Sequence, residues 1–503
     1  MTGLVAQTSP DYWFLEGSQI ANTPAYTSGN SVVPLIDGAA YMENLHRRIK
    51  SLGKGDFLYF LGWRVTQTQN LLGEGDISGS LLDEFEHLLS IGVDVRCLIW
   101  YFPASALRVG REYFQLRGNI GFVSALNGLK KPNGVALLDQ RLRPWALSSH
   151  HQKSIILGAK ERVAAYVGGI DICRDRWDTP DHDSSPRRTK QKHEGWHDAH
   201  CLVEGPAVAQ LWDNFRDRWN DLNPAHRNPF APKPRIPPAI SDDSRPQDSP
   251  VSNGTHHVQV LCTLAGSGVY SFAPDGEQSV NHALARAIDR SRHYIYIEDQ
   301  FFWPCSLIER LREAAGRGVK IILLLANRSF RGILAKYHNA MRFEALEQVR
   351  GLAPENVFVS QLQQSGLGPE IHVHAKLWII DDRYVSIGSA NVTQRSMATD
   401  SELTVAIVDG DTTESKMQGL PLVVGRFAKE LRISLWTEHL GLEDRGSIED
   451  PIEQESGRPA GWPISQNSSS GSPSYRHHAV CHEVPEPRRT WPKWVPRVLM
   501  NPG

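Results

Sequence analysis

A His-x-Lys pair that opens an apolar run occurs once in each half of this chain. The first pair is His151 and Lys153, and the second is His374 and Lys376. Side chains two positions apart on a strand share a face, so each pair directs an imidazole and an ammonium to one place. A chain that repeats this unit is expected to fold as two related halves whose motifs meet across a single cleft.

The same order of predicted elements precedes each pair. An apolar strand, an amphipathic helix and a second buried strand are predicted over 57–65, 81–89 and 93–100, and again over 294–302, 307–315 and 319–326. Strands that alternate with helices predict an α/β fold with a mixed, helix-flanked β-sheet in each half. A pseudo-twofold relation between the halves would bring both motifs to their interface.

A stretch rich in proline, aspartate and serine separates the halves and is typical of a linker. We therefore predict an N-terminal repeat over 1–222, a Pro-rich linker over 223–256, a C-terminal repeat over 257–442 and a low-complexity tail over 443–503. Within the tail, the serine-rich segment 468–473 is expected to be flexible. The aromatic segment 491–496 is expected to pack on the body, with membrane contact as the alternative.

Both motifs resemble the phospholipase D superfamily, whose signature is H-x-K-x4-D followed by a G-G or G-S turn. Further segments that look like parts of this family lie at 12–17, 59–63, 196–198, 294–300 and 388–391. The resemblance covers roughly residues 10 to 440. It implies a fold of two pseudo-twofold-related α/β repeats with the active site at their interface.

The first motif departs from the family signature at its aspartate. Asp381 stands at the required position after His374, whereas Gly158 occupies the equivalent position after His151. In the family this aspartate is a supporting residue, so we expect activity to be kept. A degenerate binding module is the alternative that Gly158 suggests, and the intact His-x-Lys pairs argue against it.

Each imidazole needs an acceptor on its second nitrogen, because that contact sets the tautomer and the ring orientation. Asp198 and Glu402 occupy equivalent places in strand-like runs that follow the two glycine turns. We predict that Glu402 orients His374 and that Asp198 orients His151, as the family pattern also implies. Exposed carboxylates at strand ends are the alternative.

The residue types suit cleavage of a phosphodiester through a covalent phosphohistidine. One neutral imidazole attacks phosphorus, the other donates a proton to the leaving alkoxide, and the two lysines balance the phosphoryl charge. The spacing leaves open which histidine attacks. The family precedent favours His151 as nucleophile and His374 as acid.

Other residues near the motifs are candidates for binding the substrate. Asn391 can donate a hydrogen bond to phosphoryl oxygens, whereas its counterpart Asp171 cannot when ionised. Glu298 and Gln300, at a strand end, either line the cleft or only terminate the strand. The full set of predicted substrate-binding residues is Gly168, Gly169, Asp171, Glu298, Gln300, Ser389 and Asn391.

Bulk properties limit the partners. The net charge of −2 argues against a general nucleic-acid binder. The start of the chain lacks the pattern of a secretory signal, and no apolar run approaches the roughly 20 residues of a membrane span. We expect a cytoplasmic or peripheral membrane location, with signal-independent export as the alternative. A basic insertion with Arg187, Arg188, Lys190 and Lys192 is either a solvated loop or a lid that contacts anionic lipid.

No cluster has the spacing of a metal site, so we expect neither a metal nor another cofactor. The sequence thus predicts a phospholipase D-type enzyme that hydrolyses phosphatidylcholine or a related glycerophospholipid to phosphatidic acid and free headgroup, with transfer to alcohols. A nuclease or another phosphodiesterase on the same fold is the main alternative, and a cardiolipin-synthase-type transferase is the next.

Overall fold

The computed structural model describes most of the 503-residue chain. The described residues are 9–17, 25–73, 79–101, 111–141, 148–159, 162–182, 195–221, 237–247, 254–266, 268–327, 333–364, 370–442, 445–462 and 479–483. The basic run 187–192 and the segments 468–473 and 491–496 lie outside these ranges, so the predictions for them stay predictions.

The N-terminal half forms a mixed sheet. Across this sheet the strands are β1 (Thr27–Ile36), β8 (Ala199–Glu204), β6 (Arg162–Gly168), β5 (Ser154–Ala159), β2 (Phe57–Gly62), β3 (Asp94–Trp100) and β4 (Gly134–Asp139). The pairs β2–β3 and β3–β4 are parallel, and the remaining pairs are antiparallel.

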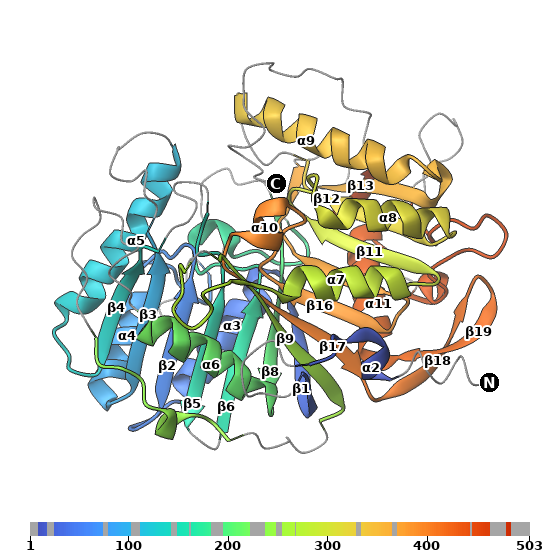
Figure 1. Cartoon of the computed structure of the whole chain (residues 1–503). Coiled ribbons are helices and arrows are strands. Elements are labelled where there is room, and N and C mark those ends of the chain that lie inside the picture. Colours follow the sequence, from blue (N-terminus) through green and yellow to red (C-terminus); the bar gives the residue numbers. More distant parts are fainter. Residues whose placement is uncertain are drawn as a thin grey trace.

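The C-terminal half repeats this order strand for strand. Its strands are β9 (His256–Leu264), β17 (Glu402–Asp409), β16 (Tyr384–Gly388), β15 (Leu377–Ile380), β11 (Tyr294–Asp299), β12 (Lys320–Leu325) and β13 (Val357–Gln364). The parallel pairs again fall at β11–β12 and β12–β13. The matching order and directions confirm the predicted fold of two α/β repeats (Figure 1).

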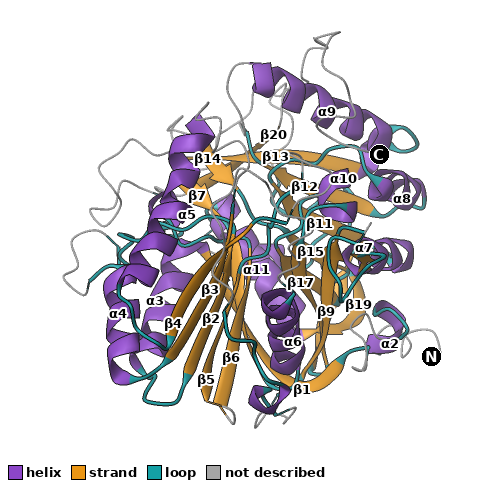
Figure 2. Cartoon of the chain, turned by 60° about the vertical axis from the view of Figure 1, so that its left-hand side comes forward, coloured by secondary structure: helices purple, strands orange, loops and turns teal. Residues whose placement is uncertain are grey.

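Helices cover the outer faces of both sheets and fill the space between them. The helices are α2 (Pro10–Trp13), α3 (Asp37–Lys50), α4 (Leu81–Ile91), α5 (Arg111–Gly128), α6 (Ala207–Asn220), α7 (Ser279–Arg290), α8 (Ser306–Gly316), α9 (Ile333–Arg350), α10 (Gln394–Ala398) and α11 (Arg426–Leu440). Helices α6 and α11 lie between the sheets, as Figure 2 shows, and share one core with their inner faces. Helices α3 and α4 pack on the outer face of the first sheet, and α7 and α8 pack on that of the second.

Strand β2 shows why the apolar runs are nearly continuous. Tyr59 and Leu61 belong to the core between the sheets, whereas Leu58 and Phe60 belong to the outer core. A strand that is buried on both faces has no side in contact with solvent, so its sequence does not alternate between apolar and polar residues. The sequence pattern therefore indicates a central strand, as observed.

Short pairings join the two sheets at more than one place. Strand β7 (Gly195–His197) of the first half runs parallel to β14 (Glu370–Val373) of the second half. The beginning of β1 also pairs with β9. The β7–β14 pairing ends next to His374, and an isolated bridge between His150 and Ser401 joins the halves beside the first motif.

The tail differs from the prediction in its first part. Residues 445–462 pack on the body, and Ile448, Ile452 and Trp462 lie in the core between the sheets. Strand β20 (Ala479–Glu483) extends the second sheet through β13. The remaining described strands are β10 (Glu277–Gln278) and the hairpin β18 (Thr412–Met417) with β19 (Leu420–Gly425). Among the described residues no helix has the length and apolarity to cross a membrane.

Candidate active site

The two His-x-Lys pairs lie at the interface of the halves, each just before or at the start of a central strand. His151 and Lys153 precede β5, and His374 and Lys376 precede β15. Both lysines and His374 are buried, and the side chain of His151 is 13% exposed. The four predicted catalytic side chains thus come together around the junction of the two sheets.

The backbone of each motif is held by the opposite half. The N–H of His151 donates to the carbonyl of Ser401 at 2.9 Å, and the N–H of His374 donates to that of His197 at 2.7 Å. Ser401 directly precedes Glu402, and His197 directly precedes Asp198. Each carboxylate is therefore carried to the histidine of the other half.

The predicted pairing of carboxylates and histidines is wrong. His151 Nδ1 lies 3.0 Å from Glu402 Oε2, and His374 Nδ1 lies 2.7 Å from Asp198 Oδ2. The assignment within each half failed because both carboxylate strands end at the interface, where the nearest imidazole belongs to the opposite repeat. The two carboxylates nevertheless fix the imidazoles as expected, leaving Nε2 of each ring as the reactive nitrogen.

Three of the predicted substrate-binding residues pack closely against the strands that carry the two carboxylates. Ser389 Oγ donates to Glu402 Oε2 at 2.5 Å. At Gly169, a Cβ would lie 2.2 Å from Asp198 Oδ1, so only glycine fits beside that carboxylate. At Gly168, a Cβ would lie 2.5 Å from the Cα of His200. The glycine and serine turns thus permit close packing behind the imidazoles.

The lysines are held close to their own histidines. Lys153 Nζ donates to the carbonyl of His151 at 3.0 Å and lies 3.6 Å from Asp171 Oδ2. Lys376 Nζ donates to the carbonyl of His374. The other oxygen of Asp171 accepts the N–H of Arg64 at 2.9 Å, so this residue joins the loop after β2 to Lys153.

Asn391 and Gln300 remain candidates for contact with a substrate. Asn391 is buried, and its Oδ1 makes no hydrogen bond to the described residues. Gln300 is half-buried, and its Nε2 lies 3.3 Å from Nε2 of His372. Glu298 differs, because its fully buried carboxylate accepts from Tyr296 Oη at 2.8 Å and lies 3.0 Å from His197 Nε2.

The motif aspartate acts far from the imidazoles. Asp381 accepts the backbone N–H groups of His293 and Tyr294, each at 2.8 Å, and so anchors the beginning of β11. In the first half Gly158 has φ +134°, and a Cβ there would lie 2.0 Å from the carbonyl oxygen of Arg162. The close pairing of β5 with β6 at Gly158 therefore excludes an aspartate there.

Burial and charge set the ionisation of the site. Burial lowers the pKa of His151 and His374 well below the usual histidine value, and Lys153 and Lys376 lower them further. Burial raises the pKa of Glu402 to about 7 and lowers that of Lys376 to about 8. At neutral pH and without substrate, both imidazoles are therefore neutral.

Aromatic residues that the motif analysis did not assign border the histidines. The ring of Trp63 meets that of His151 edge-on at 5.9 Å, and the ring of Trp196 lies 5.0 Å from that of His374. Arg176 stacks on Trp196 at 3.6 Å. Both tryptophans belong to the family-like segments. Arg176 could not be predicted from the sequence, because its position depends on its stacking against Trp196.

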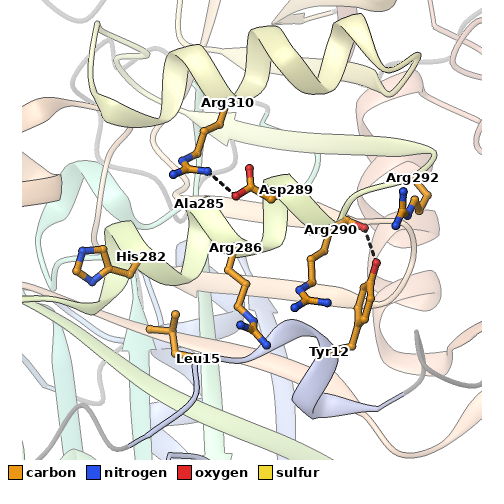
Figure 3. Close-up of a pocket in the computed structure, with 9 residues that line it drawn as sticks. All are labelled: Tyr12, Leu15, His282, Ala285, Arg286, Asp289, Arg290, Arg292 and Arg310. Atoms are coloured by element: carbon orange, nitrogen blue, oxygen red, sulfur yellow. Dashed lines mark hydrogen bonds and ion pairs between the residues drawn. The ribbon is translucent and has the colours of Figure 1, made fainter.

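A separate open pocket of about 570 Å³ lies between α2, α7 and α8 (Figure 3). Its charged lining contains Arg286, Arg290, Arg292 and Arg310, and Arg310 pairs with Asp289. It contains none of the His-x-Lys residues.

The structure also brings together residues that could hold a metal ion. Asp37, His182, His197 and Glu438 each offer one ligand atom, and these atoms lie within 4.8 Å of one another. This group was not predicted from the sequence, because its members are scattered along the chain and have no recognisable spacing.

Comparison with known proteins agrees with this geometry. A family model described as "Phospholipase D" matches residues 56–313, about half of the chain. The chain belongs to the phospholipase D family. A model described as "Cardiolipin synthase, PLD-like domain" matches residues 284–418 of this phospholipase D family member.

Two curated relatives carry the same family name. Phospholipase D1 of Schizosaccharomyces pombe is 30% identical over 395 residues, which cover 59% of this chain and 27% of the relative. Phospholipase D beta 2 of Arabidopsis thaliana is 24% identical over 527 residues, covering 78% of this chain and 56% of the relative. The chain thus spans between about a quarter and a little over half of the length of these relatives.

A solved structure shares the fold. The phosphatidylserine synthase of Haemophilus influenzae aligns with a TM-score of 0.53 at 13% identity, covering 77% of this chain and 84% of that chain. At this identity the likeness concerns the fold alone.

Proposed function

We propose that this chain hydrolyses the phosphodiester bond of a glycerophospholipid, phosphatidylcholine or a related lipid, to phosphatidic acid and a free headgroup. The observation that carries the proposal is the pair of His-x-Lys motifs, each of whose imidazoles contacts a buried carboxylate of the opposite half. Two oriented imidazoles and two buried ammonium groups are what a two-step displacement at phosphorus requires. Membership of the phospholipase D family supports a lipid diester as the substrate class.

In the first step, neutral His151 attacks phosphorus through Nε2. Contact with Glu402 holds its Nδ1 proton, so the lone pair of Nε2 is available for the new N–P bond. As this bond forms, the bond from phosphorus to the headgroup oxygen breaks. Lys153 and Lys376 balance the charge on the phosphoryl oxygens in the transition state.

His374 is the proposed acid for the leaving headgroup. An anionic diester between the lysines favours the imidazolium form, because opposite charge stabilises the protonated ring. The 2.7 Å contact with Asp198 stabilises that imidazolium further. In the second step neutral His374 takes a proton from water, whose oxygen attacks phosphorus and releases His151.

Substitution of the two histidines tests this mechanism. His151→Ala and His374→Ala should each lower headgroup release at least about 10³-fold, because nucleophile and acid act as a unit. His282→Ala is the matched control, since His282 is exposed on α7 and far from the motifs in the sequence. Near-normal turnover by either motif variant would exclude the mechanism.

Alcohol capture tests the covalent step. A phosphatidyl-histidine intermediate can be opened by butanol in place of water, so phosphatidylbutanol should form beside phosphatidic acid. Headgroup release without any transfer product, at all butanol concentrations, would favour direct attack by water.

The substrate class is tested by a parallel screen over diesters. We expect release of choline, ethanolamine or glycerol from phospholipid vesicles, and no useful cleavage of single- or double-stranded DNA. Cleavage of DNA without headgroup release from any phospholipid would favour the nuclease alternative. Faster turnover on vesicles than on short-chain monomers would support peripheral contact with a membrane surface.

A further inference from the structure

A buried cluster of histidines and carboxylates lies next to the backbone of His197 and Asp198, the two residues that hold His374. Its members are Asp37 at the start of α3, His182 before β7, His197 on β7 and Glu438 on α11. Asp37, His182 and His197 are fully buried, and the side chain of Glu438 is 13% exposed. The proposed reaction uses none of these four side chains.

One ligand atom from each of the four residues lies within 4.8 Å of the other three. His197 Nδ1 lies 3.1 Å from Asp37 Oδ1 and 3.2 Å from Glu438 Oε1. His182 Nε2 lies 3.5 Å from Glu438 Oε1 and 3.9 Å from Asp37 Oδ2. A tetrahedral ion bound at about 2.0–2.2 Å would separate its ligands by roughly 3.3–3.6 Å. The two contacts of Glu438 Oε1 are close to this range, and either oxygen of Asp37 would need only a small shift to complete the set.

Hydrogen bonding alone does not account for the inner atoms of the cluster. His197 Nδ1 and Glu438 Oε1 make no hydrogen bond to the described residues, although they are only 3.2 Å apart. Asp37 Oδ2 likewise accepts none from these residues. Buried polar atoms are rarely left in this state. A shared cation would satisfy all of them at once.

The outer nitrogens of both histidines contact carboxylates. His182 Nδ1 lies 3.1 Å from Asp178 Oδ2, and His197 Nε2 lies 3.0 Å from Glu298 Oε2. A metal-bound histidine commonly donates its second N–H to a carboxylate, which directs the lone pair of the first nitrogen toward the ion. Both rings have this arrangement, and it gives the buried Glu298 a role.

We infer that Asp37, His182, His197 and Glu438 form a binding site for one four-coordinate divalent transition-metal ion. The ion that this ligand set fits best is Zn²⁺. Two imidazoles and two carboxylates in a tetrahedron suit Zn²⁺, whereas Ca²⁺ and Mg²⁺ prefer oxygen ligands in higher coordination. Three ligands come from the N-terminal half and Glu438 from the C-terminal half, so the ion would link the halves.

The site is connected to the proposed acid through the peptide of Asp198. Asp37 Oδ1 accepts the N–H of Asp198 at 3.2 Å, and the N–H of Asp37 donates to the carbonyl of Asp198 at 2.8 Å. The metal would therefore fix the residue that contacts His374. It would act as a positioning ion and take no part in the reaction at phosphorus.

Metal analysis of the purified full chain tests this inference without any lipid assay. After growth with Zn²⁺ and extensive dialysis, we expect inductively coupled plasma mass spectrometry to find about one equivalent of Zn²⁺ per chain. X-ray absorption at the zinc edge should show four nitrogen and oxygen ligands at about 2.0–2.1 Å, two of them imidazoles. A chain substituted with Co²⁺ should show the visible bands of a tetrahedral ion.

Two variants assign the ion to this cluster. His182→Gln and Glu438→Gln should each weaken Zn²⁺ binding at least tenfold, whereas the buried control His338→Gln, on α9, should retain one equivalent. Absence of metal and of a Co²⁺ spectrum in the unmodified chain would overturn the inference and leave an ion-paired cluster of protonated histidines. Full binding in both cluster variants would also overturn it. These measurements need no phospholipid, so a failure of the metal site can be told apart from a failure of the proposed phospholipid hydrolysis.

Discussion

The ionisation of Glu402 and Lys376 predicts a narrow pH optimum for headgroup release. Glu402 must be ionised to accept the Nδ1 proton of His151, and burial raises its pKa to about 7. Lys376 must be charged to stabilise the phosphoryl oxygens, and burial lowers its pKa to about 8. Activity should therefore rise with pH as Glu402 loses its proton and fall as Lys376 loses its own.

The size of the effect follows from these two values. If only the form with ionised Glu402 and protonated Lys376 is active, it reaches about 60% of the enzyme near pH 7.5 and about 9% at pH 6 or pH 9. The ratio kcat/KM should thus fall roughly sevenfold on each side of the optimum. The ratio is the quantity to measure, because it reports on the free enzyme.

Two substitutions separate the limbs of the profile. Glu402→Gln keeps the shape of the side chain but cannot ionise, so the fall of kcat/KM at acidic pH should disappear. The maximum of kcat/KM should also fall roughly 10- to 150-fold, because a charge-assisted contact is lost. Lys376→Arg should move the basic limb out of range, because the guanidinium keeps its proton above pH 12.

The assay is choline release from phosphatidylcholine in mixed micelles between pH 5.5 and 9.5 at constant ionic strength. His282→Ala should keep the profile of the parent chain, and circular dichroism at each pH checks that the fold persists. An acidic limb that stays in place in Glu402→Gln, or a basic limb that stays in Lys376→Arg, would refute the assignment of these groups.

Three further predictions follow from contacts around the site and in the core. Asp198→Asn should lower kcat by roughly 10²- to 10⁴-fold at unchanged thermal stability, because the wrong tautomer of His374 becomes favoured; an unchanged kcat would contradict the observed pairing. Gly169→Ala should reduce turnover at least about tenfold, since its Cβ would overlap Asp198, whereas Gly121→Ala on α5 meets no atom within 4 Å and serves as control. Trp436→Ala should cost about 3–5 kcal/mol in the free energy of unfolding, measured by denaturant titration, because the ring is fully buried between the sheets. A loss below about 1 kcal/mol would mean that the core can close around the cavity.

The repeated pattern in the sequence determined the architecture. Apolar runs that are buried on both faces mark the central strands, and their matching order in the two halves predicts two sheets built alike. The His-x-Lys pairs stood out through their repeated context, although the structure places them directly before strands β5 and β15 and not on them. These properties are local, and local properties can be read along a chain.

Tertiary structure decided which half each functional group serves. Glu402 and Asp198 reach the histidine of the opposite repeat because Ser401 and His197 pair with the backbone across the interface. Glu298 contacts the buried His197, a neighbour that depends on how the two halves pack. No spacing in the sequence encodes such contacts.

The buried cluster shows the same limit most clearly. Asp37, His182, His197 and Glu438 come from two helices, a loop and a strand that are far apart in the chain. The expected low-complexity tail also supplied Trp462 to the core, because one apolar side chain near the right surface suffices for packing. Sequence periodicity records which face of an element is apolar, whereas only the packing of whole elements determines which side chains meet.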